Sequence, residues 1–265
     1  RGYECFGHDP SHEALTAYGL LLFNDMKKVY DVDQKMVALT KEWLMKQRDG
    51  QGGFKRNRRG GHHWLVKKDC SNAYILWSLM ETGESPGSLE KEIAEVKRAA
   101  LTSDDSYVVA LAANALHIAG DKTTAKKLMF LLASKQKSDG SVDGVKSSMV
   151  GSSGESLLVE GTALSSIAWL REPEFAGNVA KSMKFLADSC KGGRYGSTQA
   201  TVLSLRAIVE NDKRNAHPKA PGKIRVSLDG KPIGSWVHFD KSSRGTIELP
   251  DLSKNLTSGK HIVEI

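Results

Sequence analysis

The helical segments of this chain are of two kinds, which alternate along the sequence as far as about residue 217. One kind carries no Asp, Glu, Lys or Arg: 14–23, 71–80, 106–119, 161–170 and 197–205. The other kind is amphipathic: 33–46, 88–100, 122–135 and 174–187. A helix that is uncharged all round must be covered all round, whereas an amphipathic helix exposes one face to water. The alternation therefore predicts a mainly α fold, an α/α toroid with an inner ring of uncharged helices and an outer ring of amphipathic ones.

A repeated turn supports this architecture. The segments 43–54, 130–140 and 185–196 each close an outer helix with an aromatic residue followed by Leu, and then turn the chain through Asp-Gly or Gly-Gly. A closed six-hairpin barrel holds twelve helices and the sequence predicts nine, so we expect a toroid that is truncated at its N-terminus.

Capping residues delimit several of these helices. Ser11, Ser103 and Asp121 stand where an N-cap belongs, and Pro173 suits a first turn. Gly83 and Gly120 follow predicted helix ends.

The hydrophobic period changes to two after the Pro-containing segment 215–222. Strands are predicted at 223–228, 233–239, 246–249 and 261–265, with Asp229-Gly230 as a hairpin turn. We therefore expect two domains, a helical domain over 1–215 and a partial β-module over 222–265.

Composition excludes several classes of protein. With 265 residues, 40% hydrophobic, the chain can bury a sizeable core, and no apolar stretch is long enough for a transmembrane segment. The excess of 38 Lys and Arg over 31 Asp and Glu is modest, and we expect no nucleic acid partner. Cys5, Cys70 and Cys190 lack the spacing of a metal or redox motif, and their disulfide pairing is open. We expect no metal and no cofactor.

The segment 54–68 is the strongest candidate for chemistry. It holds six Lys or Arg, no acid, and the adjacent pair His62 and His63. Three interpretations follow: a catalytic histidine whose pKa the neighbouring cations lower, an anion-binding patch, or a solvated basic loop.

Other polar features indicate structure rather than chemistry. Asp104 and Asp105 precede a helix and suit its cap and first turn. His117 lies on an uncharged helix and is expected to be a hydrogen-bonded core residue. The Gly-rich run 192–196 follows a helix, which favours a tight turn over a phosphate loop.

Several stretches resemble the thioester domain of the alpha-2-macroglobulin and complement family. They are Tyr-Gly-Ser-Thr-Gln-Ala-Thr at 195–201, Val-Glu-Gly-Thr-Ala at 159–163, and the segments 106–110 and 15–18. The segments 2–7, 13–19 and 52–56 are most similar to bacterial-type members. The resemblance covers roughly residues 1–215.

The resemblance implies an α/α six-hairpin toroid inserted into a CUB-like β-domain. It implies a secreted or periplasmic protease inhibitor with an internal thioester between the Cys and Gln of a Cys-x-Glu-Gln motif, which captures a target after proteolytic cleavage. This chain contains no Cys-x-Glu-Gln. Any thioester would therefore be supplied from outside it.

The resemblance also gives the histidines a role and the chain its partners. In complement relatives a His lies about eight residues beyond the aromatic of the Asp-Gly turn, and counting from Phe54 gives His62, with His63 next. That His accepts the acyl group and passes it to a hydroxyl. The implied partners are proteases or a target-cell surface, together with the remaining macroglobulin and CUB domains of the parent.

Two other functions stay open. A thioester-less adhesion or scaffold module would use the basic loop to bind anionic surfaces. A terpenoid cyclase or prenyltransferase shares the toroid, but the inner helices lack the acidic cluster or the Asp, Cys and His zinc ligands that those enzymes need. The sequence therefore predicts a protein that is not an enzyme.

Overall fold

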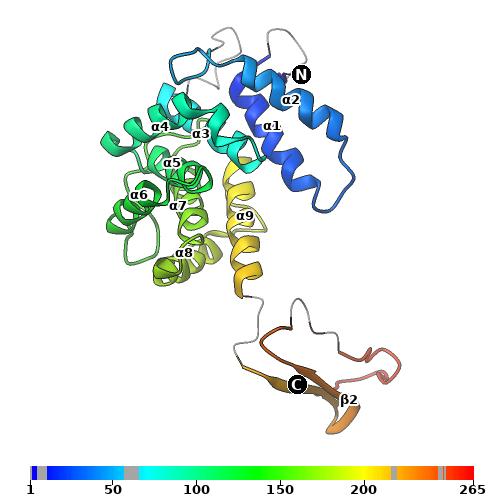
Figure 1. Ribbon diagram of the computed structural model, residues 1–265. Coiled ribbons are helices and arrows are strands. Elements are labelled where there is room, and N and C mark those ends of the chain that lie inside the picture. The colour runs from blue at the N-terminus through cyan, green and yellow to red at the C-terminus, as the bar shows by residue number, and fades with distance from the viewer. Residues whose placement is uncertain (1, 5–10, 57–65, 216–219, 244–246, 248) are drawn as a thin grey trace. The chain divides into compact units, whose positions relative to one another are not determined.

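The computed structural model describes residues 2–4, 11–56, 66–215, 220–243, 247 and 249–265. The chain forms two compact units, Arg1–Ala207 and Ile208–Ile265. The first unit is helical and the second carries a small antiparallel sheet (Figure 1). A mainly α domain followed by a partial β-module is therefore confirmed.

The helices of the first unit alternate between an inner and an outer position. The inner helices are α1 (Glu13–Met26), α3 (Lys68–Glu81), α5 (Ser106–Ile118), α7 (Gly154–Trp169) and the first part of α9 (Thr198–Asn215). The outer helices are α2 (Gln34–Lys46), α4 (Glu90–Thr102), α6 (Lys122–Ser134) and α8 (Ala176–Ser189). Short 3-10 helices, η2 (Pro86–Ser88) and η3 (Pro173–Phe175), precede α4 and α8.

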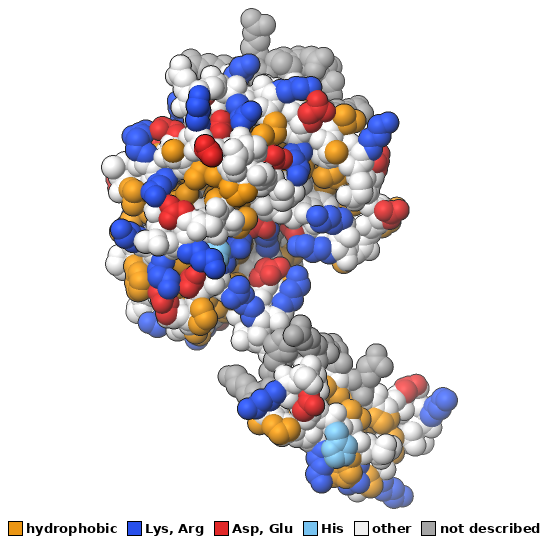
Figure 2. All heavy atoms as spheres, viewed as in Figure 1, with side chains coloured by type: hydrophobic (Ala, Val, Ile, Leu, Met, Phe, Trp, Pro, Cys, Tyr) orange, Lys and Arg blue, Asp and Glu red, His pale blue; other side chains and the backbone are white. Residues whose placement is uncertain are grey.

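Burial separates the two layers clearly. Every residue from Cys70 to Met80 on α3 and from Ser106 to Leu116 on α5 is buried. On α2 only Thr40 and Leu44 are buried. Lys, Arg, Asp and Glu side chains are mixed over the visible face of the helical unit (Figure 2). The alternation of uncharged and amphipathic helices in the sequence therefore corresponds to a buried inner layer and a solvent-exposed outer layer.

The prediction that every uncharged helix is covered all round is wrong for α1 and α9. Leu22 on α1 is 43% exposed and Leu205 on α9 is 52% exposed. These helices have neighbours on only part of their circumference, so the absence of charge did not report complete burial. Helix α9 also continues beyond the predicted limit of 205 into a charged segment that ends at Asn215.

Two predicted caps lie one or two residues from the observed ones. His12, not Ser11, caps α1 and accepts from the amide of Ala14. Asp105, not Ser103, caps α5 and accepts from the amide of Tyr107. Asp121 caps α6 as predicted.

Each of the three repeated turns closes with an antiparallel bridge, and the third turn is shorter than the other two. After α2, α6 and α8 the chain doubles back through an antiparallel bridge, which joins Arg48 to Phe54, Gln136 to Val142 and Lys191 to Arg194. The repeat therefore marks equivalent passages from an outer helix to the next inner helix.

The second unit contains a three-stranded sheet of order β2-β1-β3. Strand β1 (Gly222–Leu228) pairs antiparallel with β2 (Lys231–Phe239) and with β3 (Val263–Glu264). Asp229 and Gly230 have φ of 50° and 77°, which confirms the predicted hairpin turn because both residues take the left-handed conformation. Residues 246 and 248 of the predicted strand 246–249 lie outside those described.

Candidate functional site

The N-terminal ends of the inner helices meet around Glu160 of α7. The side chain is fully buried, and three serine hydroxyls donate to it: Ser148 at 2.8 Å, Ser152 at 2.5 Å and Ser197 at 2.9 Å. Ser197 also accepts from the amide of Ala200 and so caps α9. One carboxylate therefore ties the loop before α7 to the start of α9.

Burial dominates the electrostatics of this carboxyl group. Desolvation raises the pKa of Glu160 above its usual value of 4.5, and hydrogen bonds from the serines and from Tyr107 oppose the rise. The hydroxyls stabilise the ionised form, but they do not compensate fully for the removal of water.

Aromatic hydroxyls and an amide surround Glu160. Burial raises the pKa of Tyr107 and of Tyr74. The Nε2 atom of Gln199 lies 3.5 Å from the Tyr74 hydroxyl, and its buried Oε1 has no hydrogen-bond donor within the described part of the chain. Gln199 lies within the Tyr-Gly-Ser-Thr-Gln-Ala-Thr segment, so that segment faces the interior at this end.

The loop between α6 and α7 lies over the start of α5 and the middle of α7. Asp105 holds it through the amide of Lys146 at 2.9 Å, and Ser106 donates to the carbonyl of Asp143 at 2.6 Å. The amide of Val142 donates to the Thr162 hydroxyl at 3.0 Å. Polar side chains at these two places therefore define the path of this loop.

A buried thiol lies at the same end of the domain. Cys70, in the first turn of α3, is completely buried, and burial, reinforced by the charges of Asp105 and Glu160, raises its pKa well above the usual value. Cys190 is exposed after α8, and neither of these two described cysteines is in a disulfide. Cys5 lies outside the described residues.

The predicted histidines His62 and His63 lie outside the described residues, so the structure brings neither into a site. The described ends of their loop are held together, because Arg56 donates to the carbonyl of Val66. Phe54, from which His62 was counted, is buried, and its amide lies 3.3 Å from Oδ1 of Asn72 in α3. Both ends of the basic loop are thus anchored beside the N-terminal part of α3.

Two of the other sequence interpretations are confirmed, and the prediction that His117 is a core residue is wrong. Asp105 caps α5, and the Gly-rich run 192–196 is a tight turn with positive φ at Gly192, Gly193 and Gly196. His117 is half-buried at the end of α5, and its Nδ1 lies 3.6 Å from Glu172. It therefore has a partly exposed acidic neighbour rather than a place in the core.

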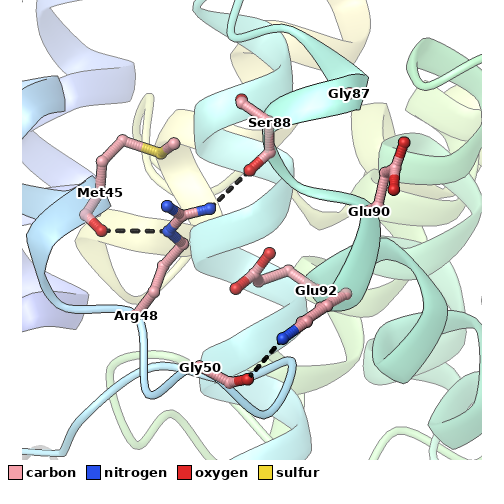
Figure 3. A pocket seen from close by; sticks show the side chains of 8 residues that line it. Met45, Arg48, Gly50, Gly87, Ser88, Glu90 and Glu92 are labelled. Atoms are coloured by element: carbon pink, nitrogen blue, oxygen red, sulfur yellow. Dashed lines mark hydrogen bonds between the residues drawn. The ribbon is translucent and has the colours of Figure 1, made fainter.

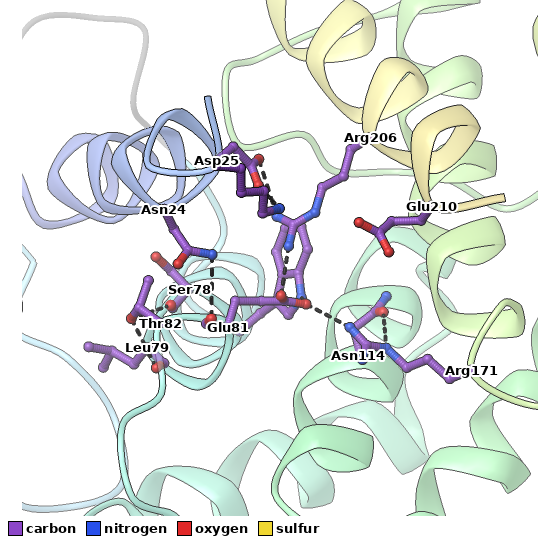
Figure 4. Close-up of polar contacts among 12 residues, drawn as sticks. Asn24, Asp25, Ser78, Leu79, Glu81, Thr82, Asn114, Arg171, Arg206 and Glu210 are labelled. Atoms are coloured by element: carbon purple, nitrogen blue, oxygen red, sulfur yellow. Dashed lines mark hydrogen bonds and ion pairs between the residues drawn. The ribbon is translucent and has the colours of Figure 1, made fainter. Parts of the chain in front are cut away.

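The C-terminal ends of the inner helices meet in a second polar cluster (Figure 4). Glu81, at the end of α3, accepts from Arg171 at 2.6 Å and from Arg206 at 2.7 Å. Arg206 also stacks over Trp77 at 4.9 Å, and Arg171 donates to Asn114 of α5. Arg171 lies just beyond the C-terminal end of α7, where a cation complements the helix dipole, and Arg206 from the middle of α9 supplies a second cation to Glu81.

The sequence did not predict that the residues of either polar cluster come together. The available signal was Glu160 itself, a single acid beside the charge-free stretch 161–170. An acid in such a place requires hydrogen-bond donors. Its three serines come from positions 148, 152 and 197, and only the tertiary fold brings these together.

No group of three or more His, Cys, Asp or Glu side chains in the described part of the chain is placed to hold a metal ion. No helix there has the length and apolar character needed to cross a bilayer.

Inner helices backed by amphipathic outer helices define an α/α helical domain. The model of the A-macroglobulin TED domain matches residues 1–211, and the chain belongs to this family.

A solved structure shows the same fold. The native alpha-2-macroglobulin from Escherichia coli, crystallised from domain MG7 to the C-terminus, matches with a TM-score of 0.52 at 13% sequence identity. The match covers 88% of this chain and 33% of that one. This chain therefore spans about a third of the length of that crystallised fragment.

Proposed function

We propose that this chain is part of a macroglobulin-like protein that traps proteases outside the cell or in the periplasm. In this proposal residues 1–215 form a thioester-type α/α toroid domain, incomplete at its N-terminus, and residues 222–265 form part of a CUB-like β-domain. The partners are the attacking protease or a target surface and the other macroglobulin domains of the parent. The chain is not an enzyme.

The observation that carries this proposal is the family match over residues 1–211. Two structural features support it. The segments that resemble the family, at 159–163 and 195–201, both contribute to the Glu160 cluster through Glu160 and Ser197. The two-layer order of helices is the one that the family fold requires. The family match also favours this proposal over the cyclase interpretation.

Within this proposal His62 is the acyl-transfer residue. Its imidazole attacks the thioester carbonyl, forms an acyl-imidazole and releases the cysteine thiolate. A hydroxyl of the target then attacks the acyl-imidazole, the thiolate takes the hydroxyl proton, and the imidazole leaves. Without such a histidine the thioester reacts by preference with amines.

The first test is the intact mass of the full-length parent before and after treatment with methylamine, combined with a count of free thiols. One methylamine adduct and one new thiol establish a thioester. The absence of both leaves a steric trap or a thioester-less scaffold, and His62 then returns to being a residue of the basic loop.

A matched pair of variants tests the histidine. In a parent with a thioester, His62→Ala is expected to lower transfer to glycerol relative to transfer to methylamine, while His63→Ala retains the wild-type ratio. A wild-type ratio in His62→Ala assigns the role elsewhere.

The scaffold alternative depends on the six Lys and Arg of segment 54–68. Binding to an anionic polymer that weakens steeply as salt is raised favours it, because screening removes the attraction.

A further inference from the structure

A cavity of about 420 Å³ opens between the end of α2 and the start of α4 (Figure 3). Met45, Arg48 and Gly50 form one wall, and η2 and the first turn of α4 form the other. The turn that follows α2 lies close against α4: a Cβ atom on Gly52 would be 2.7 Å from the carbonyl oxygen of Lys91. The volume lies within the range of small-molecule pockets.

The two cations that line the cavity already have acceptors. Arg48 donates to the carbonyl of Ser88 at 2.5 Å and to that of Met45 at 3.2 Å. Lys91 donates to the carbonyl of Gly50 at 3.2 Å. These contacts fix both walls and leave the cations bonded to backbone rather than to acids.

Glu92 is the buried charged residue of the cavity lining, and its carboxylate has no hydrogen-bond donor among the described residues. Its side chain points into the cavity between Arg48 and Gly50, and the residue is only 3% exposed. Among the described residues no side chain or backbone group donates a hydrogen bond to its carboxylate or forms an ion pair with it. The carboxylate is shielded from bulk solvent but borders the cavity, so it is suited to a ligand that brings hydrogen-bond donors.

A structural explanation accounts for only part of this arrangement. Acidic residues in the first turn of a helix interact favourably with its dipole, and both Glu90 and Glu92 stand there. Glu90 achieves this in an exposed position. The dipole therefore does not explain why Glu92 is buried at the wall of a cavity.

We propose that this cavity binds a primary ammonium group, which donates to the Glu92 carboxylate and to the carbonyl oxygens of the wall. The lining carries two acids, Glu90 and Glu92, against the two cations Arg48 and Lys91. The cavity therefore has no net positive charge that would oppose an ammonium group in direct contact with Glu92. The site is independent of the thioester chemistry and lies on residues that no step above uses.

The test follows backbone amide shifts of the 265-residue protein by NMR. The probe is Nα-acetyl-lysine N-methylamide, and the matched control is Nα-acetyl-norleucine N-methylamide, which has the same chain length without the ammonium. We expect saturable shifts at 48–50 and 87–92 with the lysine probe alone. Equal shifts with both probes, or none with lysine, overturn the proposal.

A pair of variants locates the contact. Glu92→Gln is expected to weaken binding about tenfold, the loss typical of a hydrogen bond to a charged group, and Glu90→Gln to change it less than about twofold. Equal effects of the two variants overturn the proposal. If Glu92→Gln does not fold, the comparison of the two probes on the wild type still decides.

n-Butylamine separates two sources of the ammonium group. Tighter binding of the lysine probe assigns the site to a lysine side chain of a partner protein, and equal binding assigns it to free amines. Both outcomes support an ammonium site.

Discussion

A Cβ atom placed on Gly161 would lie 2.4 Å from Cγ2 of Val145. Gly161 is in α7, and Val145 is in the loop that crosses it, so the missing side chain allows the loop to lie directly on the helix. Real Cβ atoms do not approach this closely, and an added methyl group must displace the loop.

We therefore expect Gly161→Ala to lower the free energy of unfolding by about 1–3 kcal/mol, the usual cost of overpacking, although alanine is the better helix former. Urea denaturation measures it. Gly177→Ala in α8 is the matched control, because nothing lies within 4 Å of its added Cβ. It should stabilise the protein by up to about 1 kcal/mol. Equal midpoints for the two variants contradict this account of Gly161.

Glu160→Gln tests the buried carboxyl group through pH. The folded protein holds the Glu160 proton more tightly than the unfolded chain does, because burial raises the pKa above 4.5. Ionisation therefore removes stability as pH rises from 4.5 through the folded pKa, by about 1.4 kcal/mol for each unit of difference. The variant lacks this loss.

Its stability relative to wild type should accordingly increase with pH. Urea midpoints at several pH values measure the difference. Glu155→Gln removes an exposed carboxylate from the same helix and serves as the control. A difference for Glu160→Gln that stays flat from pH 4 to 8 excludes the assigned shift.

Glu81→Gln tests the second cluster. It leaves Arg171 and Arg206, whose side chains are 21% and 10% exposed, without their common anion. Breaking a largely buried pair in this way should cost about 2–3 kcal/mol. The exposed pair of Glu95 with Arg98 gives the comparison, and Glu95→Gln should cost less than about 1 kcal/mol. Similar losses in both variants would show that the Glu81 cluster contributes no more than a surface pair.

His261 in the β-unit offers a separate titration. Its Nδ1 lies 2.6 Å from Oδ2 of Asp229, and this hydrogen bond raises the pKa of His261 above 6.5. The interaction stabilises the unit between the usual pKa of Asp229, 3.8, and pH 6.5, and it is lost as pH rises through the folded pKa of His261 or falls through that of Asp229. NMR titration should show a raised pKa in the wild type and a lower one in Asp229→Asn. Asp240→Asn, at another exposed turn, should leave it unchanged.

The sequence predicted the helical layers well and the polar ends poorly. The sequence predicted the inner helices α3 and α5 because nearly all of their residues are buried, and burial on every side requires a helix without charged residues. Helix α7 was started at residue 161 instead of Gly154, since Glu155 and Glu160 break the charge-free run. The donors that permit a buried Glu160 come from distant positions, and no local pattern reports them.

The prediction that α1 and α9 are buried on every side was wrong for a related reason. Leu22 and Leu205 look the same in sequence as the buried leucines of α5, because local composition does not count the neighbours of a helix. The Asp229-Gly230 turn succeeded because the required backbone conformation depends on those two residues alone.

The complete burial of Cys70 has a practical consequence for the chemistry proposed for the parent. A thiol that is shielded from solvent and holds its proton tightly does not react with alkylating reagents in the native state. Cys190 remains accessible there. A native count therefore omits Cys70, and a count after denaturation adds it with or without a thioester. Only the change in the number of free thiols that methylamine produces, measured under one fixed condition, distinguishes a thiol released from a thioester from the buried thiol of Cys70.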